Sequence, residues 1–203
     1  MEITIIDKVK FLTKERKKKI ISVLRKRQKD LTLIIDNIHD PHNVSAILRS
    51  CDAFGVYKIH LYYTTDKFPE LGKKSSASAI KWVEKERHKD AKSMIEKLRK
   101  EGFRVIATGF SERARPLPEW DLTVPVAIIL GNEHRGVSEE LASLVEDELY
   151  IPMQGMVQSL NVSVAAAIIL YEAWKQRSLK GMYSRPSFDY RTLKKLFYEW
   201  CSK

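Results

Sequence analysis

The chain has 203 residues, of which 44% are hydrophobic, so it is long enough for one sizeable core but not comfortably for two. No apolar run approaches the roughly 20 residues of a membrane span, and the N-terminus lacks the apolar stretch of a signal peptide. Its two cysteines form no CxxC pair, and its five histidines show no ligand spacing, so neither a disulfide framework nor a zinc site is signalled. These features predict a cytoplasmic, metal-free protein of one domain with appendages.

The predicted elements alternate between helices and strands. The strands are short, apolar and rich in β-branched residues, at 31–36, 58–63, 103–108, 126–130 and 148–151. The helices show apolar residues at helical spacing, at 14–29, 43–54, 89–101, 138–144 and 161–174. Gly55 and Gly102 stop two of these helices, and the last helix is apolar nearly all round. The order predicts an α/β fold with a largely parallel sheet and helices on both faces.

The net charge of +10 is divided unevenly along the chain. Residues 1–30 carry eleven Lys and Arg against four Asp and Glu, and residues 173–203 carry eight against two. The two ends therefore hold +7 and +6, and residues 31–172 hold −3. Seven of the nineteen aromatic residues lie among the C-terminal cations. Rings beside cations suit looped RNA, although solvated lysine-rich helices give the same charge pattern and some rings must serve an apolar helix face.

Polar residues with glycine or proline directly follow three predicted strands, in segments 37–55, 129–136 and 151–167. Ligands of open α/β sheets bind at these carboxyl ends. The chain is poor in Asn and Gln, yet all four asparagines lie in or beside these segments: Asn37, Asn43, Asn132 and Asn161. This placement suggests a task that other side chains cannot perform.

The usual cofactor motifs of α/β proteins are absent. GNEHRG has the G-x-x-x-x-G spacing of a phosphate-binding loop, but Val137 stands where that loop needs its lysine. There is no GxGxxG and no GxSxG. A glycine-rich turn and a proline-glycine loop remain, whose backbone groups could hold an adenine between the apolar walls of Ile151, Met153 and Leu160.

Together, three motifs resemble those of the SPOUT methyltransferases. They are N-x-x-x-x-x-R from Asn43 to Arg49, ILGNEHRG at 129–136 and IPMQGMVQSLNVSVA at 151–165. The resemblance covers residues 31 to about 176 and is greatest with the TrmH family of tRNA (guanosine-18) ribose 2′-O-methyltransferases. It implies S-adenosylmethionine bound in a C-terminal deep trefoil knot, an exception to unknotted chains. It also implies tRNA as substrate and an obligate homodimer with active sites at the interface.

The resemblance also divides the chain. Residues 1–30 become a basic N-terminal helical extension, 31–176 the methyltransferase core, and 177–203 a basic, aromatic C-terminal helical extension. The three motifs describe the cofactor site and not the RNA, so an rRNA ribose 2′-O-methyltransferase and a non-catalytic RNA-binding relative stay open.

By resemblance, five residues are catalytic: Arg49, Asn43, Glu133, Ser159 and Asn161. Arg49 would either accept the proton of the ribose 2′-hydroxyl or orient and stabilise its oxygen. The second role is physically easier because a guanidinium stays protonated. The plainer alternative is a surface arginine that pairs with Asp52 and contributes little.

The other catalytic candidates have plainer alternatives too. Asn43 could be a helix N-cap, Ser159 and Asn161 could cap the helix that follows them, and Glu133 could be a loop carboxylate near its neighbours His134 and Arg135. Five further residues are expected to contact the cofactor: Thr108, Gly131, Ile151, Met153 and Leu160. The expected chemistry needs no metal, because the sulfonium of S-adenosylmethionine is itself a good leaving group.

Overall fold

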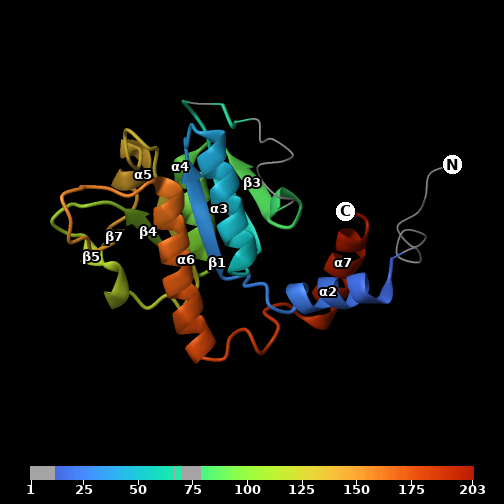
Figure 1. Ribbon diagram of the computed structural model, residues 1–203. Helices are drawn as coiled ribbons and strands as arrows, with labels where there is room; N and C mark the ends of the chain where they lie inside the picture. The colour runs from blue at the N-terminus through green and yellow to red at the C-terminus, as the bar shows by residue number, and fades with distance from the viewer. Residues whose placement is uncertain (1–11, 66, 70–78) are drawn as a thin grey trace.

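The computed structural model describes residues 12–65, 67–69 and 79–203, and within them it contains one sheet of seven parallel strands (Figure 1). The strand order is β3-β2-β1-β6-β4-β7-β5. In chain order the strands are β1 (Leu31–Asp36), β2 (Lys58–Tyr62), β3 (Glu84–His88), β4 (Arg104–Thr108), β5 (Arg115–Pro116), β6 (Val126–Leu130) and β7 (Asp147–Tyr150). The predicted α/β architecture is confirmed.

The structure describes six helices, four of which cover the two faces of this sheet while the first and the last lie beside it. They are α2 (Lys14–Leu24), α3 (Pro41–Ala53), α4 (Ala91–Lys100), α5 (Glu139–Ser143), α6 (Val162–Leu179) and α7 (Tyr190–Cys201), with 3₁₀ turns η1 (Ala79–Lys81) and η2 (Leu117–Glu119). In β1, Leu33 and Ile35 join the apolar core beneath α3 and α6, whereas Ile34 joins the core beneath α4 and α5. Because strand side chains alternate, one apolar run serves both layers. Gly102 ends α4 at a φ of 86°, as a helix stop requires.

The sequence-based predictions differ from the structure in a few elements. The edge strands β3 and β5 were not predicted, since the EKERH sequence of β3 has no apolar residue. The first helix ends at Leu24, not at residue 29, because the backbone of Gln28 pairs instead with Gly55 and Val56. The last core helix runs on to Leu179. No helix among the described residues is long and apolar enough to cross a membrane.

Two helices from opposite ends of the sequence, α2 and α7, pack together beside the sheet (Figure 1). We call this pair the arm unit. Its small apolar core consists of Ile20, Leu24, Leu196, Trp200 and Cys201. The C-terminal aromatic residues therefore divide: Trp200 is buried, whereas Tyr190 and Tyr198 are exposed. Ile21, although it lies beside Ile20 on α2, is exposed.

Two buried arginines lie where the arm unit meets the core. Arg177, at the end of α6, donates hydrogen bonds to the carbonyls of Leu122 and Val124, each at 2.9 Å, and to the Asp30 carboxylate at 2.5 Å, so it holds α6 to the segment before β1. Arg27, which follows α2, pairs with the carboxylate of Asp52 on α3, and its guanidinium lies over the ring of Trp200 on α7. Because a buried charge that loses its partner is costly, the Arg27 contacts fix the arm unit to the core.

Candidate active site

A pocket of about 510 Å³ opens at the carboxyl ends of β4, β6 and β7. These strands are neighbours in the sheet, so the loops that follow them converge there. The volume lies in the range of small-molecule sites. The ends of these strands, the loops that follow them and the first turns of α6 supply the lining: Thr108, Gly109, Phe110, Leu130, Gly131, Asn132, Glu133, His134, Gly136, Leu149, Tyr150, Ile151, Met153, Ser159, Leu160, Asn161, Val162, Ala165 and Ile169.

All five expected cofactor residues line this one pocket: Thr108, Gly131, Ile151, Met153 and Leu160. The Thr108 hydroxyl donates to the carbonyl of Ile129 at 2.9 Å, which ties β4 to β6 at the pocket floor. Gly131 cannot carry a side chain, because a Cβ there would lie 2.1 Å from the backbone of Gly136. The pocket therefore depends on a glycine where two backbone segments touch. Gly155, by contrast, has no neighbouring atom that would exclude a Cβ.

Asparagine side chains connect the loops to one another. Asn132 donates to the carbonyl of Asn37 at 2.6 Å, which joins the loop after β6 to the loop after β1. The side-chain oxygen of Asn37 accepts from the backbone of Thr64 and Thr65, beyond β2. Asn37 itself has a positive φ of 48°, which asparagine tolerates better than most residues. These bonds give a physical reason for asparagines in a sequence otherwise poor in amides.

The other two asparagines form a polar chain with Glu133 across the pocket rim. Asn161 Nδ2 donates to Asn43 Oδ1 at 3.0 Å, and Asn43 Nδ2 donates to Glu133 Oε1 at 2.8 Å. Asn43 is thus not the N-cap of α3, since Asp40 occupies that position and accepts from the backbone of His42. Asn161 does cap α6, so its capping and bridging roles coexist. Three segments distant in sequence are thereby held together.

Glu133 is held by more than Asn43. Its carboxylate also accepts from the backbone N–H groups of His39 and Asp40, at 3.1 and 3.3 Å. Partial burial by itself would raise the pKa of Glu133, but the hydrogen bonds from Asn43 and these backbone groups outweigh it, so the pKa lies below its usual value. Glu133 is therefore ionised at neutral pH and joins α3 to the loop after β6.

Arg49 and Ser159 are the remaining expected catalytic residues. Ser159 is exposed and lines the pocket. Arg49 is also exposed, on α3, but lies outside the pocket lining, and its side chain makes no hydrogen bond or ion pair within the described part of the chain. Its alternative partner Asp52 is bound by Arg27 instead. The structure thus connects four of the five residues to one pocket and leaves the Arg49 head group available.

Sequence reasoning missed Glu148, which shapes the pocket wall from β7. Its carboxylate accepts from the backbone of Ser111 at 3.0 Å and from Arg113 Nε at 3.2 Å. A Cβ on Gly109 would lie 2.0 Å from the same carboxylate. Glu148 therefore sets the path of the loop that follows β4. Nothing in the sequence signals this contact, because Glu148 lies on β7 and its partners lie in the loop after β4.

Residues 30–171 match the model of the SpoU rRNA Methylase family, and the chain belongs to this family. The family expected from the three motifs is therefore confirmed. The chain is 46% identical to a tRNA (guanosine(18)-2′-O)-methyltransferase of Thermus thermophilus, over 94% of this chain and 98% of that protein.

Solved structures give the same result. The TrmH/SpoU tRNA modifying enzyme of Aquifex aeolicus has a TM-score of 0.87 and 40% identity, covering 93% of this chain and 95% of that one. The SpoU methyltransferase AviRb of Streptomyces viridochromogenes, solved in complex with AdoMet, has a TM-score of 0.66 and 28% identity, covering 76% of this chain and 64% of that one.

Proposed function

We propose that this chain uses S-adenosylmethionine to methylate the ribose 2′-oxygen of guanosine 18 in tRNA, in the cytoplasm. The observation that carries the proposal is the 46% identity to a tRNA (guanosine(18)-2′-O)-methyltransferase over nearly the full length of both chains. The 191 matched residues extend beyond the family match at 30–171, so the likeness includes part of the basic ends.

The pocket fits S-adenosylmethionine, which AviRb binds. Leu130, Leu149 and Leu160 provide apolar walls for a flat adenine, and Gly131 leaves backbone groups accessible to its polar edge. When bound, the cofactor supplies a methyl group on a sulfonium, which is a good leaving group. Thr108, Ile151 and Met153 complete the proposed cofactor-binding set.

The remaining task is to align the ribose oxygen and relieve it of its proton. We assign to Arg49 the orientation of the 2′-hydroxyl and the stabilisation of the developing alkoxide, because a guanidinium remains protonated. Ser159 and Asn161 line the pocket, and Asn43 is hydrogen-bonded to Asn161 and Glu133 beside it, so these three side chains can position the nucleotide. Glu133 acts as a positioning residue, since both its oxygens already accept hydrogen bonds from this chain.

The division of the chain and its assembly belong to the same proposal. Residues 31–176 form the methyltransferase core, and residues 1–30 and 177–203 form RNA-binding extensions. The core carries a deep trefoil knot near its C-terminal end, a proposal supported by the likeness to the Aquifex aeolicus structure. Two chains form a dimer through α6, which carries apolar residues on its exposed side. The exposed position of Arg49 outside its own pocket supports active sites shared between two subunits.

An rRNA ribose methyltransferase is the rival within the family. The three motifs describe the cofactor site and do not distinguish the two RNAs. The 46% identity to a tRNA (guanosine(18)-2′-O)-methyltransferase, over 94% of this chain and 98% of that protein, favours tRNA. The exposed basic residues of α2 and α7 offer a surface for its phosphates.

A methyl-transfer assay tests the proposal. Purified protein is incubated with labelled S-adenosylmethionine and either full-length tRNA, the same tRNA with adenosine at position 18, or rRNA. We expect label in the first RNA alone, and resistance of the bond after nucleotide 18 to alkaline cleavage, because a methylated 2′-oxygen cannot attack the phosphate.

Arg49→Ala should keep cofactor affinity but lose about 10²- to 10³-fold in turnover. Label in rRNA alone would overturn the tRNA assignment, and unchanged turnover of Arg49→Ala would overturn the role of Arg49.

A further inference from the structure

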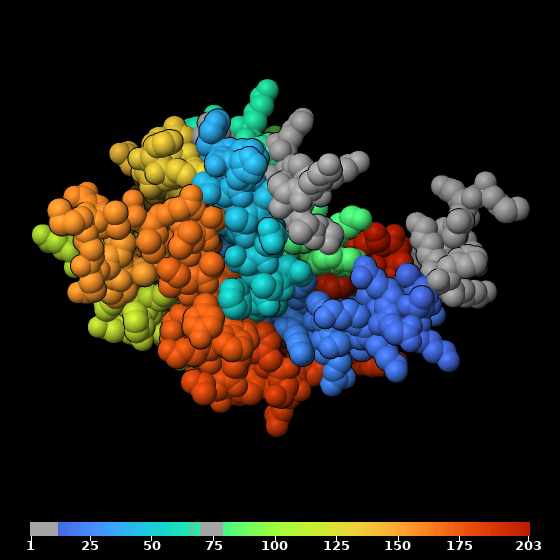
Figure 2. Space-filling view, in the orientation of Figure 1, coloured from blue at the N-terminus to red at the C-terminus, as the bar shows by residue number. Residues whose placement is uncertain are grey.

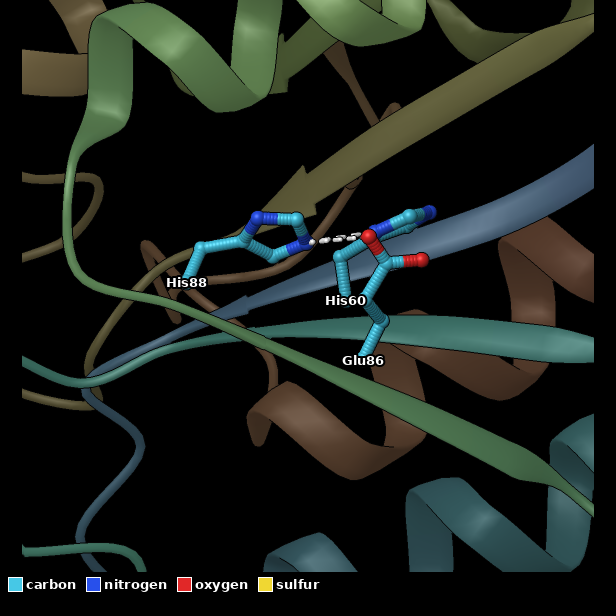
Figure 3. Close-up of side chains that lie close together, drawn as sticks. All are labelled: His60, Glu86 and His88. Carbon is cyan, nitrogen blue, oxygen red and sulfur yellow. Dashed lines mark hydrogen bonds and ion pairs between the residues drawn. The ribbon is translucent and has the colours of Figure 1, made fainter.

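A second cluster of chemically competent side chains lies at the opposite edge of the sheet from the pocket. His60 on β2 and Glu86 and His88 on the edge strand β3 point toward one another (Figure 3). The register pairs His60 with Glu86 and Tyr62 with His88, so all three cluster residues emerge on one face. Their spacing in sequence gave no sign of this cluster, because two separate strands supply it.

The geometry of the cluster is compact. His60 Nδ1 lies 2.9 Å from His88 Nε2, and His88 Nε2 lies 3.7 Å from Glu86 Oε1. The three ligand atoms all fall within 4.8 Å of one another. His60 is buried, and His88 and Glu86 are partly buried. An imidazole is mostly neutral at pH 7, so a ring nitrogen of each histidine can offer its lone pair.

We propose that His60 Nδ1, His88 Nε2 and the Glu86 carboxylate bind one divalent transition-metal ion of the Zn²⁺ type, with water in the fourth position. Two imidazoles and a carboxylate are a known ligand set for Zn²⁺. Ligand nitrogens about 2.0–2.1 Å from a tetrahedral metal lie roughly 3.3 Å apart. The two ligand nitrogens, now 2.9 Å apart, would therefore have to separate by only a few tenths of an ångström. Each ring would keep its proton on the nitrogen that does not bind the metal, Nε2 of His60 and Nδ1 of His88.

Two lysines compete with the metal for Glu86. Lys58, on β2, lies 2.8 Å from Glu86 Oε2, and Lys97, on α4, contacts Glu86 Oε1. Both lysine side chains are more than two-fifths exposed, at 41% and 45%, so they can turn into solvent when a metal takes the carboxylate. This competition lowers metal affinity, and it predicts that removing a lysine raises that affinity.

The site would act on the stability of the sheet and not on methyl transfer, since β3 and the pocket strand β4 are separated by three strands in the sheet order. The EKERH strand has no apolar residue to pack against the core. A metal shared by β2 and β3 would therefore pin an edge strand that otherwise depends on hydrogen bonds and ion pairs.

Titration of the chelator-treated, full-length protein with Co²⁺ and Zn²⁺ tests this inference. We expect one ion per chain, the visible absorption of four-coordinate Co²⁺, and a higher melting temperature with excess Zn²⁺. His88→Gln and His60→Gln should each weaken binding about tenfold or more, and Lys97→Met should tighten it. The matched controls His42→Gln and His134→Gln change exposed histidines elsewhere and should leave binding unchanged.

Several outcomes would overturn the site. They are absence of Co²⁺ absorption in the wild-type protein, unchanged affinity in His88→Gln, or loss of binding in the His42 or His134 controls. If His60→Gln fails to fold because His60 is buried, the partly exposed His88 still decides the question. Methylation of tRNA is measured in parallel. It should persist in His88→Gln, so a failure of the metal site and a failure of the proposed function are distinguishable.

Discussion

Glu133 shows how a single carboxylate can organise a site without reacting in it. Two backbone N–H groups at the start of α3 and the amide of Asn43 all point at its two oxygens. A neutral amide in the same place would offer one oxygen and one NH₂ group, and the NH₂ group would face other donors. The charge and the acceptor-only character of glutamate are therefore both used.

Glu133→Gln should lower the free energy of unfolding by about 1–3 kcal/mol at pH 7, because donors at the start of α3 lose their acceptor. The pKa of Glu133 in the folded protein is below its ordinary value of 4.5. The stabilisation is thus complete above pH 4.5 and is lost as the pH falls through the folded pKa. Urea unfolding of both proteins from pH 7 to pH 3 should show the difference shrinking. The control Glu96→Gln, at an exposed site in the middle of α4, should show no difference at any pH.

The sequence indicated individual residues that stand out, but it did not indicate which residues they contact. The scarcity of amides singled out Asn43 and Asn161, and both lie in the polar chain. Asn43 was considered an N-cap because helix starts are read from local spacing, and Asp40 three positions earlier is an equally good cap. The partners of Glu133 and Glu148 could not be predicted, since only the tertiary fold brings them together.

Among the elements, α6 presents different residues on its two sides. Its first turns carry Asn161, Ala165 and Ile169 at the pocket. Its outer side exposes Val164, Tyr171 and Trp174, at 46%, 52% and 37%. In Figure 2 the surface of this segment adjoins that of α3, which carries Arg49. The sequence predicted an apolar helix but not which apolar residues face outward, because a helix that is apolar all round has no distinguishing stripe.

The proposed dimer gives a direct prediction for α6. Val164→Glu combined with Tyr171→Glu should yield a monomer in sedimentation, because each charge would be buried in the subunit interface. Methylation should be lost with it if the two subunits share active sites. Tyr190→Glu places the same charge on an exposed aromatic of α7 and should remain dimeric. A wild-type monomer at micromolar concentration would contradict the proposal.

At the scale of the whole molecule, the basic residues gather at the two ends of the chain, whereas the part that forms the sheet is mildly acidic. The exposed cations of α2 and α7 lie on one unit although they come from opposite ends of the chain. The uneven charge predicted two basic arms. Their union could not be predicted, because it rests on a few apolar contacts around Trp200 that resemble any amphipathic helix face.

Neutralising the arm unit should weaken tRNA binding and flatten its salt dependence. The triple variant Lys18→Gln, Lys19→Gln, Lys194→Gln removes exposed cations without touching the apolar contacts. For each phosphate that the variant no longer neutralises, the slope of log affinity against log salt should become shallower by about 0.7–0.9. Cofactor affinity, measured in parallel, should be unchanged. Lys92→Gln with Lys100→Gln on α4 is the matched control. An unchanged slope in the triple variant would place RNA recognition on the core.

The contact between α2 and α7 also bears on protein synthesis. The ribosome makes α2 near the start of translation, but the residues that cover Ile20 and Leu24 are made only some 170 residues later. Throughout that interval the apolar side of α2 lacks its partner α7, and a chain interrupted before residue 190 never gains it. A nascent chain can thus complete the sheet and its pocket before it can complete the basic surface. Incomplete products would lack the surface that α2 and α7 form together and that we propose binds tRNA. Only chains translated through α7 could therefore bind tRNA at this surface.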